Sequence, residues 1–273
     1  MADHMRLAGR TAIVTGAASG IGRGIAVALA RRRCHLALAD VDETGLERTA
    51  AMAGAHGARV SHHRLDVADP AAVAAFPGVV RSAHPGVDLL VNNAGVAVGG
   101  AFEQVSEADF EWLFGINFGG VVRMTRAFLP LLKASDDARL VNLSSVFGLI
   151  APPGQTAYAA SKFAVRGFSE SLRHELAGSP VGVTVVHPGG VATAIARKAR
   201  MPAGISADEV ARQLVAFEKM LRMPAEIAGE AIVKGVERRK DRVLVGPDAR
   251  LIALLARVAP VSYWKIVERL IGK

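Results

Sequence analysis

The feature of the sequence that most constrains its fold is the alternation of short β-rich runs with longer helix-length segments over the first two-thirds of the chain. Most of the short runs are nearly continuous stretches of Val, Leu, Ile and Ala, which is typical of parallel strands buried on both faces. The strands predicted from them span residues 11–14, 35–39, 60–64, 89–92, 140–143 and 183–187.

The segments between these runs have the length and composition of helices, and they span residues 20–32, 43–56, 70–84, 106–133 and 156–177. Strand–helix–strand alternation of this kind produces a doubly wound parallel sheet with right-handed crossovers. Hydrophobic residues make up 51% of the 273 residues, which is enough for a large core. With a last strand expected at residues 242–245, we predict an α/β fold in one domain over residues 1–273. The sheet would have about seven strands, with helices on both faces.

The C-terminal part of the chain departs from this rhythm. Residues 194–223 have a helical pattern rich in Arg and Met, inserted where the next crossover should begin, and residues 224–239 have the pattern of the following helix. Residues 249–271 carry an apolar pattern at helical spacing that is interrupted at Pro260. We therefore expect an insertion over about residues 190–223 and an amphipathic C-terminal extension over about residues 249–273.

The charge of the chain is concentrated near its C-terminus. The formal net charge is +8, and +7 of it arises from residue 194 onward, where 16 Lys and Arg face 9 Asp and Glu. A basic region of this kind attracts nucleic acid, anionic lipid or an acidic ligand, although a solvated basic surface is the simpler interpretation. We expect no nucleic-acid partner.

The sequence also indicates where the protein resides. The single cysteine, Cys34, cannot form an intrachain disulfide, which fits a reducing compartment. Residues 1–10 are polar and charged, so we expect no signal peptide. The uncharged stretch 140–161 contains Asn142, three serines and two prolines, so it is not a membrane span. We expect a cytoplasmic protein.

A glycine-rich segment follows the first predicted strand, where residues 15–22 read TGAASGIG. Glycines in such a turn let the backbone approach a pyrophosphate, and the N-terminus of the next helix stabilises its negative charge. Asp40 ends the second strand 18 residues after Gly22, close to the spacing at which a carboxylate meets the adenosine ribose hydroxyls. That carboxylate would repel a 2′-phosphate, and Val41 supplies no compensating charge, so the pattern favours NAD over NADP. Arg23 argues the other way, but it lies on the first helix.

A tyrosine and a lysine, Tyr158 and Lys162, stand four residues apart and therefore share one face of a predicted helix. A tyrosine is a poor base at neutral pH because its pKa is near 10. A neighbouring ammonium group favours the phenolate and so lowers that pKa. The alternative interpretation of the pair is an ordinary surface contact.

Taken together, the motifs resemble the short-chain dehydrogenase/reductase family over nearly the whole chain. They are TGxxxGIG at residues 15–22, Asn-Asn-Ala-Gly at residues 92–95, Ser145 lying 13 residues before Tyr158, Tyr158-x-x-x-Lys162, and Pro188-Gly189 followed by Thr193. The resemblance implies a Rossmann fold that binds a nicotinamide dinucleotide. It also implies hydride transfer between the cofactor and an alcohol or carbonyl group.

The resemblance assigns roles to four catalytic residues. Tyr158 would exchange a proton with the substrate oxygen, and Lys162 would bind the nicotinamide ribose and lower the pKa of Tyr158. Ser145 would hydrogen-bond the substrate oxygen, and its spacing from Tyr158 selects it over Ser144. Asn117 would hold a water of a proton relay. The competing interpretation of Asn117 is a buried amide that satisfies a kinked helix.

The cofactor cleft implied by the resemblance is formed by residues that follow the strands, with Asp66 at the adenine ring and the segment 188–193 at the nicotinamide. Asn92 is expected to tie neighbouring strands together. The predicted cofactor-binding residues are Gly16, Ser19, Gly20, Ile21, Gly22, Asp40, Asp66, Val67, Asn93, Ala94, Gly95, Tyr158, Lys162, Pro188, Gly189, Val191 and Thr193. No metal site is expected, because His62 and His63 point to opposite faces of a strand and other ligands do not converge.

The substrate pocket predicted from the sequence contains Ser145, Phe147 and Tyr158, and further apolar residues with the insertion acting as a lid. An apolar secondary alcohol or its ketone, such as a steroid or retinol, fits that lining. Cations of the insertion would instead suit an acidic group such as a carboxylate or a coenzyme A phosphate.

Two other functions are open at this point. One is NADPH-linked reduction of a 3-oxoacyl thioester, which Asp40 and the long C-terminal extension disfavour. The other is a catalytically inactive dinucleotide-binding protein whose basic extension docks on a membrane or a partner. The cluster Tyr263-Trp264-Lys265 would suit a membrane interface or a neighbouring subunit. The family resemblance further implies a homo-oligomer, either a dimer or a tetramer.

Overall fold

Seven parallel strands form the centre of the molecule in a computed structural model, which describes residues 4–202, 205 and 207–270. Every neighbouring pair is parallel, and the order in the sheet is β3-β2-β1-β4-β5-β6-β9. The strands are β1 (Thr11–Thr15), β2 (His35–Asp40), β3 (Val60–Arg64), β4 (Leu89–Asn92), β5 (Ala138–Leu143), β6 (Val181–Pro188) and β9 (Arg242–Val245). The prediction of a parallel sheet of about seven strands is confirmed.

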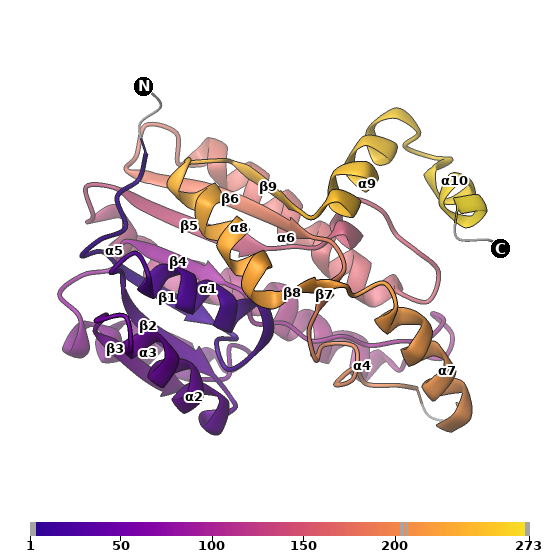
Figure 1. Cartoon of the computed structure of the whole chain (residues 1–273), viewed down its shortest axis with the longest axis horizontal. Helices are drawn as coiled ribbons and strands as arrows, with labels where there is room; N and C mark the ends of the chain where they lie inside the picture. The colour runs from indigo at the N-terminus through magenta and orange to yellow at the C-terminus, as the bar shows by residue number, and fades with distance from the viewer. Residues whose placement is uncertain (1–3, 203–204, 206, 271–273) are drawn as a thin grey trace.

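Helices cover both faces of this sheet, as predicted (Figure 1). In β1, Ala12 and Val14 join one core and Ile13 between them joins the other, because successive side chains of a strand point to opposite faces. The first core receives α1 (Gly20–Ala30), α2 (Glu43–Gly54) and α8 (Ala225–Glu237). The second core receives α3 (Pro70–Ala83), α5 (Gly120–Lys133) and α6 (Thr156–Glu175).

The strand order reverses between β1 and β4, since the chain builds outward from β1 in one direction and from β4 in the other. In a doubly wound sheet the loops at such a switch point separate at the carboxyl ends of the strands and leave a crevice for a ligand. The glycine-rich segment after β1 and the segment after β4 both begin at that edge. The topology therefore brings the predicted cofactor motifs together.

The long helix predicted over residues 106–133 runs without interruption from residue 107 to residue 133, but it contains a π-helical turn that the sequence did not predict. Ser106 caps α4 (Glu107–Phe114) by accepting a hydrogen bond from the Asp109 amide at 3.1 Å. A π-helical turn, Gly115–Gly119, then separates α4 from α5. The extra residue of a π turn rotates the helix face, and Asn117 inside it is fully buried.

The insertion is less helical than its pattern predicted. Among the described residues of the insertion, α7 (Ala207–Glu218) alone is helical, and the two ends of the insertion are joined by the short parallel strands β7 (Val191–Ala192) and β8 (Met223–Pro224). Residues 203, 204 and 206 of the expected lid lie outside the described residues.

The C-terminal extension forms α9 (Pro247–Val258) and α10 (Tyr263–Leu270), with the expected break around Pro260. Residues 271–273 of the expected extension lie outside the described residues. Both helices project from one end of the molecule (Figure 1). In the part of the chain that the structure describes, no helix is both long enough and apolar enough to cross a membrane.

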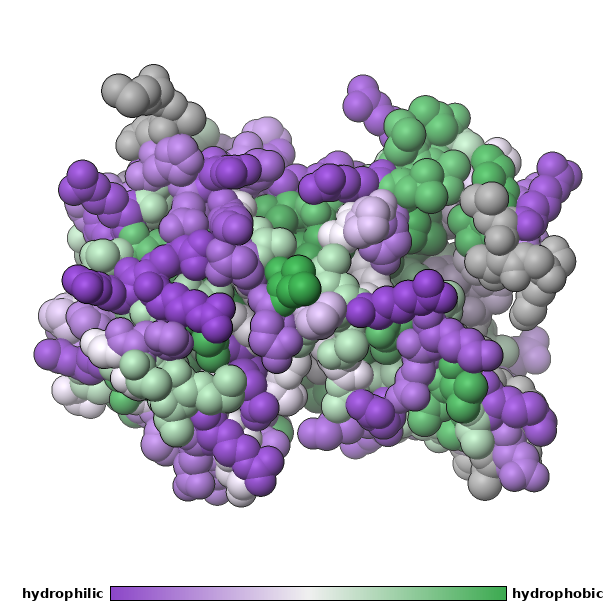
Figure 2. Space-filling view, viewed as in Figure 1, coloured by the Kyte–Doolittle hydropathy of each residue, from purple (hydrophilic) through white to green (hydrophobic). Residues whose placement is uncertain are grey.

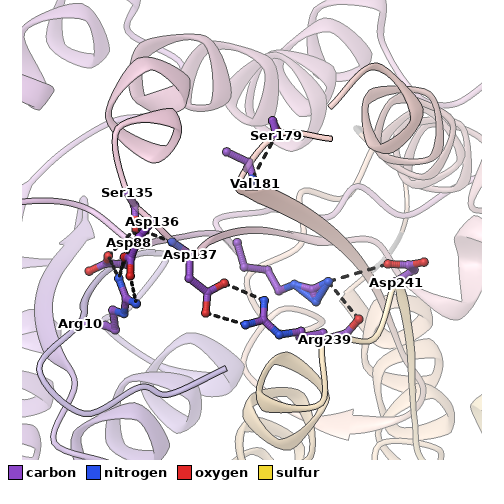
Figure 3. A network of polar contacts seen from close by, with 10 residues as sticks. Arg10, Asp88, Ser135, Asp136, Asp137, Ser179, Val181, Arg239 and Asp241 are labelled. Atoms are coloured by element: carbon purple, nitrogen blue, oxygen red, sulfur yellow. Dashed lines mark hydrogen bonds and ion pairs between the residues drawn. The ribbon is translucent and has the colours of Figure 1, made fainter. Parts of the chain in front are cut away.

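The opposite edge of the sheet, at the amino ends of the strands, is held by ion pairs (Figure 3). Arg10 contacts Asp88 at 2.9 Å, and Arg239 forms two 2.7 Å bonds to Asp137. Arg139 is buried and donates a hydrogen bond to the Arg239 carbonyl at 2.9 Å. A surface cavity lies beside these ion pairs, but none of the predicted site residues lines it. This edge therefore stabilises the fold, and the candidate site lies at the other edge.

Candidate active site

The glycine-rich loop after β1 is packed so closely that side chains are excluded from it. Gly16 has a φ of +64°, and a Cβ added there would lie 2.7 Å from the Asn93 side-chain nitrogen. A Cβ added at Gly22 would stand 2.1 Å from the Gly16 carbonyl oxygen. The Asn93 amide donates to the carbonyls of Thr15 at 2.9 Å and Gly16 at 3.1 Å. The loop is thereby fixed against the segment that follows β4, and it leads directly into the N-terminus of α1.

The two segments expected to contact the cofactor phosphates and nicotinamide meet each other. Gly20 adopts a φ of +53°, and a Cβ added there would lie 3.1 Å from a methyl carbon of Thr193. Thr193 directly follows β7, while Pro188 ends β6 and Val191 begins β7. Residues that are 173 positions apart in the sequence thus line one crevice.

Asp40 lies at the end of β2, where the sequence predicted it, and it has a role that the sequence did not predict. Its two carboxylate oxygens accept hydrogen bonds from the backbone amides of Ala18, at 3.0 Å, and Asp42, at 3.1 Å. Asp40 therefore also stabilises the glycine-rich loop through its hydrogen bond from Ala18. Arg23 donates to the Thr49 hydroxyl at 3.0 Å and to the Ala18 carbonyl oxygen, so its guanidinium is engaged behind the loop.

The remaining predicted cofactor residues lie around the same crevice. The Ala94 amide donates to the Thr15 hydroxyl at 3.1 Å. Asp66 is exposed after β3 and accepts a hydrogen bond from the Ala68 amide at 2.8 Å, whereas Val67 is buried against the start of α5. The predicted adenine end of the cleft is thus an exposed carboxylate beside an apolar surface.

Helix α6 places Tyr158 and Lys162 one turn apart. The Lys162 ammonium nitrogen lies 5.6 Å from the centre of the Tyr158 ring and donates a hydrogen bond to the Leu143 carbonyl at 3.1 Å. Lys162 is only 4% exposed, and no acidic side chain among the described residues pairs with it. A Cβ added at Gly95 would lie 3.5 Å from the same nitrogen. A buried ammonium group with two unused N–H donors therefore faces the segment after β4.

The two adjacent serines after β5 have different surroundings. The Ser144 hydroxyl is buried and donates to the backbone carbonyl of Lys162 at 2.9 Å. The Ser145 hydroxyl accepts a hydrogen bond from the Phe147 amide at 3.1 Å, which starts the short 3₁₀ turn Val146–Gly148, and it also contacts the Tyr158 hydroxyl. Phe147 packs edge-on against the Tyr158 ring at 6.2 Å. The geometry thus places Ser145, and not Ser144, at the tyrosine.

Burial shifts the pKa values of the two central groups in opposite directions. It raises the pKa of Tyr158 to about 12, against a smaller lowering by the Ser145 hydroxyl. It lowers the pKa of Lys162 to about 8. The sequence predicted a lowered tyrosine pKa. The difference arises because removal of water from the phenolate disfavours this charged form. The ammonium nitrogen of Lys162 lies 5.6 Å from the centre of the ring. At neutral pH the site therefore contains a neutral phenol beside a mostly protonated amine.

Asn117 connects three elements from within the π turn. Its side-chain oxygen accepts from the Val96 amide at 2.8 Å, and its nitrogen donates to the Val96 carbonyl at 3.0 Å and to the Ser161 hydroxyl at 3.1 Å. A Cβ added at Gly95 would lie 3.2 Å from that oxygen. Asn117 is thus a satisfied buried amide, as one of the two interpretations predicted, and it stands next to Lys162.

A second chain of buried amides lies behind the site and ties the strands together, as expected for Asn92. The Asn92 nitrogen on β4 donates to the Asn142 oxygen on β5 at 2.9 Å. The Asn142 nitrogen donates to the Ser169 hydroxyl on α6 at 2.9 Å. These bonds fix the carboxyl ends of β4 and β5 relative to the helix that carries Tyr158.

Three side chains contribute to the site through contacts that the sequence did not predict. Asp248, after β9, accepts a hydrogen bond from the Gly190 amide at 2.7 Å and so holds the loop after β6. His187 is fully buried, pairs with the Ser145 carbonyl at 2.9 Å, and has a pKa lowered to about 4 by burial. Arg200, one of the cations expected on the lid, stacks on Trp112 at 3.5 Å. The Pro-Gly motif gave a signal for the position of His187, whereas nothing in the sequence indicated Asp248.

Histidines and carboxylates do not assemble into a metal site in this part of the molecule. Among the residues that the structure describes, no group of three or more His, Cys, Asp or Glu side chains is arranged to hold a metal ion. His62 is exposed on β3, while His63 is partly buried and bonded to Ser61 at 2.8 Å.

Comparison with known proteins agrees with this geometry. Residues 10–203 match the family model for short chain dehydrogenases. The chain is 45% identical over 268 residues to the putative oxidoreductase SadH of Mycobacterium tuberculosis, covering 97% of this chain and 96% of that protein. It is 41% identical over 192 residues to the oxidoreductase UcpA of Escherichia coli, covering 70% of this chain and 73% of that protein.

Solved structures show the same likeness. A short-chain dehydrogenase/reductase from Burkholderia phymatum, crystallised in complex with NAD, superposes with a TM-score of 0.86 at 35% identity and covers 93% of this chain and 94% of its own. A short-chain dehydrogenase from Streptomyces avermitilis gives 0.79 at 28% identity over 97% and 99% of the two chains.

The doubly wound sheet and its glycine-rich switch point define a Rossmann-fold oxidoreductase. The chain belongs to the short-chain dehydrogenase family.

The residues present fit a nicotinamide dinucleotide. Side chains are excluded from the glycine-rich loop, as close approach of a pyrophosphate requires. The buried ammonium group of Lys162 has spare donors that suit a ribose diol.

Proposed function

We propose that the protein is an oxidoreductase that transfers a hydride between NAD(H) and a secondary alcohol or its ketone. The observation that supports this proposal most directly is the convergence of Ser145, Tyr158 and Lys162 beside the crevice of the glycine-rich loop. A dinucleotide-binding protein without catalysis has no need of a buried amine next to a partly buried phenol, because both groups are costly to desolvate.

The proposed chemistry assigns one task to each side chain. The bound dinucleotide supplies or accepts the hydride. In the direction of reduction, the Tyr158 hydroxyl donates its proton to the carbonyl oxygen, which becomes the alcohol oxygen. The Ser145 hydroxyl donates a hydrogen bond to the same oxygen and opposes the build-up of negative charge. The ammonium group of Lys162 binds the nicotinamide ribose and stabilises the phenolate that proton transfer leaves behind.

The direction of proton transfer follows from the pKa values. With the pKa of Tyr158 raised to about 12, the phenol keeps its proton at neutral pH and is ready to donate it. Oxidation of an alcohol requires the phenolate instead, which becomes available as the pH rises. At neutral pH the phenol is thus in the protonation state that carbonyl reduction requires.

Asn117 is proposed to act as a positioning residue in this scheme. Its bonds to Val96 and Ser161 hold the segment after β4 at a fixed distance from helix α6, which carries Lys162. A water of a proton relay would then be held next to a lysine that cannot swing away. This proposal joins the two interpretations that the sequence left open.

The preference for NAD over NADP rests on Asp40. Its carboxylate lies at the end of β2, and hydrogen bonds from two backbone amides hold it in place. A 2′-phosphate would meet this negative charge, while Arg23 is engaged behind the loop. The relative from Burkholderia phymatum was crystallised with NAD.

The proposed substrate is apolar, such as a steroid- or retinol-like alcohol or its ketone. The wall next to Tyr158 is formed by Phe147, and Val146 and Ile150 follow on the same segment. We propose residues 190–223 as the lid over this wall. Arg200 would fasten the lid, since it stacks on Trp112 and pairs with Asp109 at 2.9 Å. A homo-oligomer, which the resemblance implies, and a cytoplasmic location, which the sequence predicts, remain part of the proposal.

The experiment that tests the proposed function is turnover of a panel of secondary alcohols and ketones with NAD(H) and with NADP(H), followed at 340 nm. The panel contains steroids, retinoids, short aliphatic ketones and 3-oxoacyl thioesters. NAD-linked turnover of apolar ketones is the expected result. NADPH-linked turnover of thioesters alone would overturn the substrate and the cofactor assignment. Tight NAD binding without any turnover across the panel would favour the inactive binding protein.

A further inference from the structure

The C-terminal extension presents an apolar stripe to solvent. Leu251, Leu254 and Val258 on α9 are 52%, 57% and 68% exposed, and Val261 in the following turn is 93% exposed. These residues stand at the spacing i, i+3, i+7, which places the three helical ones on one face. Figure 2 shows the corresponding apolar surface over α9, away from the body of the molecule. We call these four residues the α9 stripe.

Basic side chains border the α9 stripe. Arg250 and Arg257 are exposed and lie along one edge of the stripe, because each directly precedes one of its members in the helix. Lys265 on α10 is also exposed. The sequence contains no Asp or Glu from residue 249 to residue 267. The stripe is therefore an apolar band with cations on its border, and Asp248, three residues before Leu251, is the acidic residue nearest to it in the sequence.

The acidic residue that precedes the stripe is turned toward the body of the molecule. Asp248 is exposed in the first turn of α9, and its carboxylate is held there by the hydrogen bond from the Gly190 amide. The aromatic residues of α10 are partly buried, and the Trp264 ring nitrogen is bonded to Glu268 at 2.6 Å. The face that remains for a partner is thus apolar and positive.

We propose that the α9 stripe docks on an anionic lipid surface. An exposed amphipathic helix with an apolar face and flanking cations has the chemistry that binds the headgroup boundary of such a membrane. A second copy of this chain is the alternative occupant, but it carries the same net charge of +8 and the same basic C-terminal region. Charge complementarity therefore favours the lipid.

Two hydrogen bonds connect the helices of the C-terminal extension to the candidate active site. Asp248 at the start of α9 holds Gly190 of the loop after β6. The Tyr263 hydroxyl at the start of α10 accepts a hydrogen bond from the Ala151 amide at 2.9 Å, on the segment that follows Phe147. An apolar substrate dissolved in the membrane would thus meet the enzyme next to its pocket. This last consequence rests on the proposed function, whereas docking itself does not.

The test is co-sedimentation of the full-length protein with vesicles of phosphatidylglycerol and phosphatidylcholine, compared with vesicles of phosphatidylcholine alone. The stripe variant is Leu254→Gln with Val258→Gln, and the charge variant is Arg250→Gln with Arg257→Gln. The control variant, Met52→Gln with Val79→Gln, removes two apolar side chains that are 44% and 45% exposed on α2 and α3. All these positions are exposed, so thermal melts and NAD titration should match the wild type.

The expected result is binding of the wild type to the anionic vesicles, reduced by salt, with little binding to phosphatidylcholine. Each arginine removed should weaken the partition constant about five-fold, and the stripe variant should weaken it by at least about ten-fold. The control variant should bind like the wild type. Because vesicle binding requires no turnover, this result is independent of the test of the proposed function.

Three results would overturn the proposal. The first is no binding of the wild type to anionic vesicles at low ionic strength. The second is equal loss of binding in the control and the stripe variants. The third is a concentration-dependent dimer in sedimentation velocity that the stripe variant abolishes, without vesicle binding by the wild type. That third result would assign the face to a second copy of the chain.

Discussion

Lys162 carries a positive charge in a buried position, and this charge destabilises the fold. Replacing Lys162 should therefore make the protein more stable. Lys162 is 4% exposed, and its ammonium group donates a hydrogen bond to the Leu143 carbonyl. A buried charge without an ionic partner is costly unless a bound ligand compensates it. We predict that Lys162→Met raises the free energy of unfolding while it abolishes turnover.

The size of the effect follows from the pKa. Burial lowers the pKa of Lys162 from 10.5 to about 8. At about 1.4 kcal/mol for each pKa unit, holding the ammonium group at pH 7 costs about 3 kcal/mol. The lost hydrogen bond to Leu143 offsets about 1 kcal/mol. Lys162→Met should therefore stabilise the protein at pH 7 by about 2 kcal/mol, which corresponds to about 5 °C in the melting temperature.

The assay is urea denaturation of the wild type and of Lys162→Met between pH 7 and pH 10.5. The unfolded lysine keeps its proton up to its ordinary pKa, while the folded lysine releases it near pH 8. The unfolded state thus binds more protons in this window, so the wild type gains stability with rising pH and the difference narrows. Lys133→Met, at an exposed lysine, is the control and should change stability by less than about 0.5 kcal/mol. Destabilisation by Lys162→Met at pH 7 would refute the reasoning.

Three further predictions concern the crevice and its chemistry. Gly22→Ala should weaken dinucleotide binding at least about ten-fold in a fluorescence titration, because its Cβ would stand 2.1 Å from a backbone oxygen. Gly54→Ala, with nothing within 4 Å, should bind normally, and equal binding by both variants would contradict the loop packing. Asp40→Ala should lower the preference for NAD, measured as the ratio of kcat/KM with NAD to kcat/KM with NADP. A wild type that prefers NADP would overturn the assignment of NAD as the cofactor. Across pH 6–10, kcat/KM for ketone reduction should fall as Lys162 deprotonates near pH 8, and alcohol oxidation should rise as Tyr158 ionises. A single pH optimum shared by ketone reduction and alcohol oxidation would argue against these roles of Lys162 and Tyr158.

The fold could be predicted because local signals and global topology agree. Continuous apolar runs require strands buried on both faces, and the helices between them leave a parallel sheet as the arrangement that covers both. Gly16, Gly20 and Gly22 stand where the chain must turn sharply into a helix, so the switch point was also visible in the sequence. The spacing from Tyr158 likewise selected the serine that the structure places at the ring.

The π turn around Asn117 could not be predicted, because the sequence there continues a helical pattern. The turn is held by hydrogen bonds to Val96 and Ser161, which lie 21 and 44 residues away. Tertiary contacts of this kind override local propensity and leave no periodic signal.

The contacts of the C-terminal extension were equally hidden. Asp248 and Gly190 are 58 residues apart, and Tyr263 and Ala151 are 112 residues apart. The raised pKa of Tyr158 was missed for a related reason. The sequence shows the neighbouring lysine but not the burial that outweighs it.

The central claim is that Tyr158 transfers the proton in a hydride-transfer reaction, and Tyr158→Phe tests it most directly. The substitution removes one oxygen from a ring that stays packed against Phe147, so the fold and the dinucleotide dissociation constant should remain those of the wild type. Loss of the proton donor should lower kcat by at least about 100-fold. The account predicts unchanged dinucleotide binding with turnover lost, measured at 340 nm on the best ketone of the panel. Wild-type turnover in the variant would contradict it.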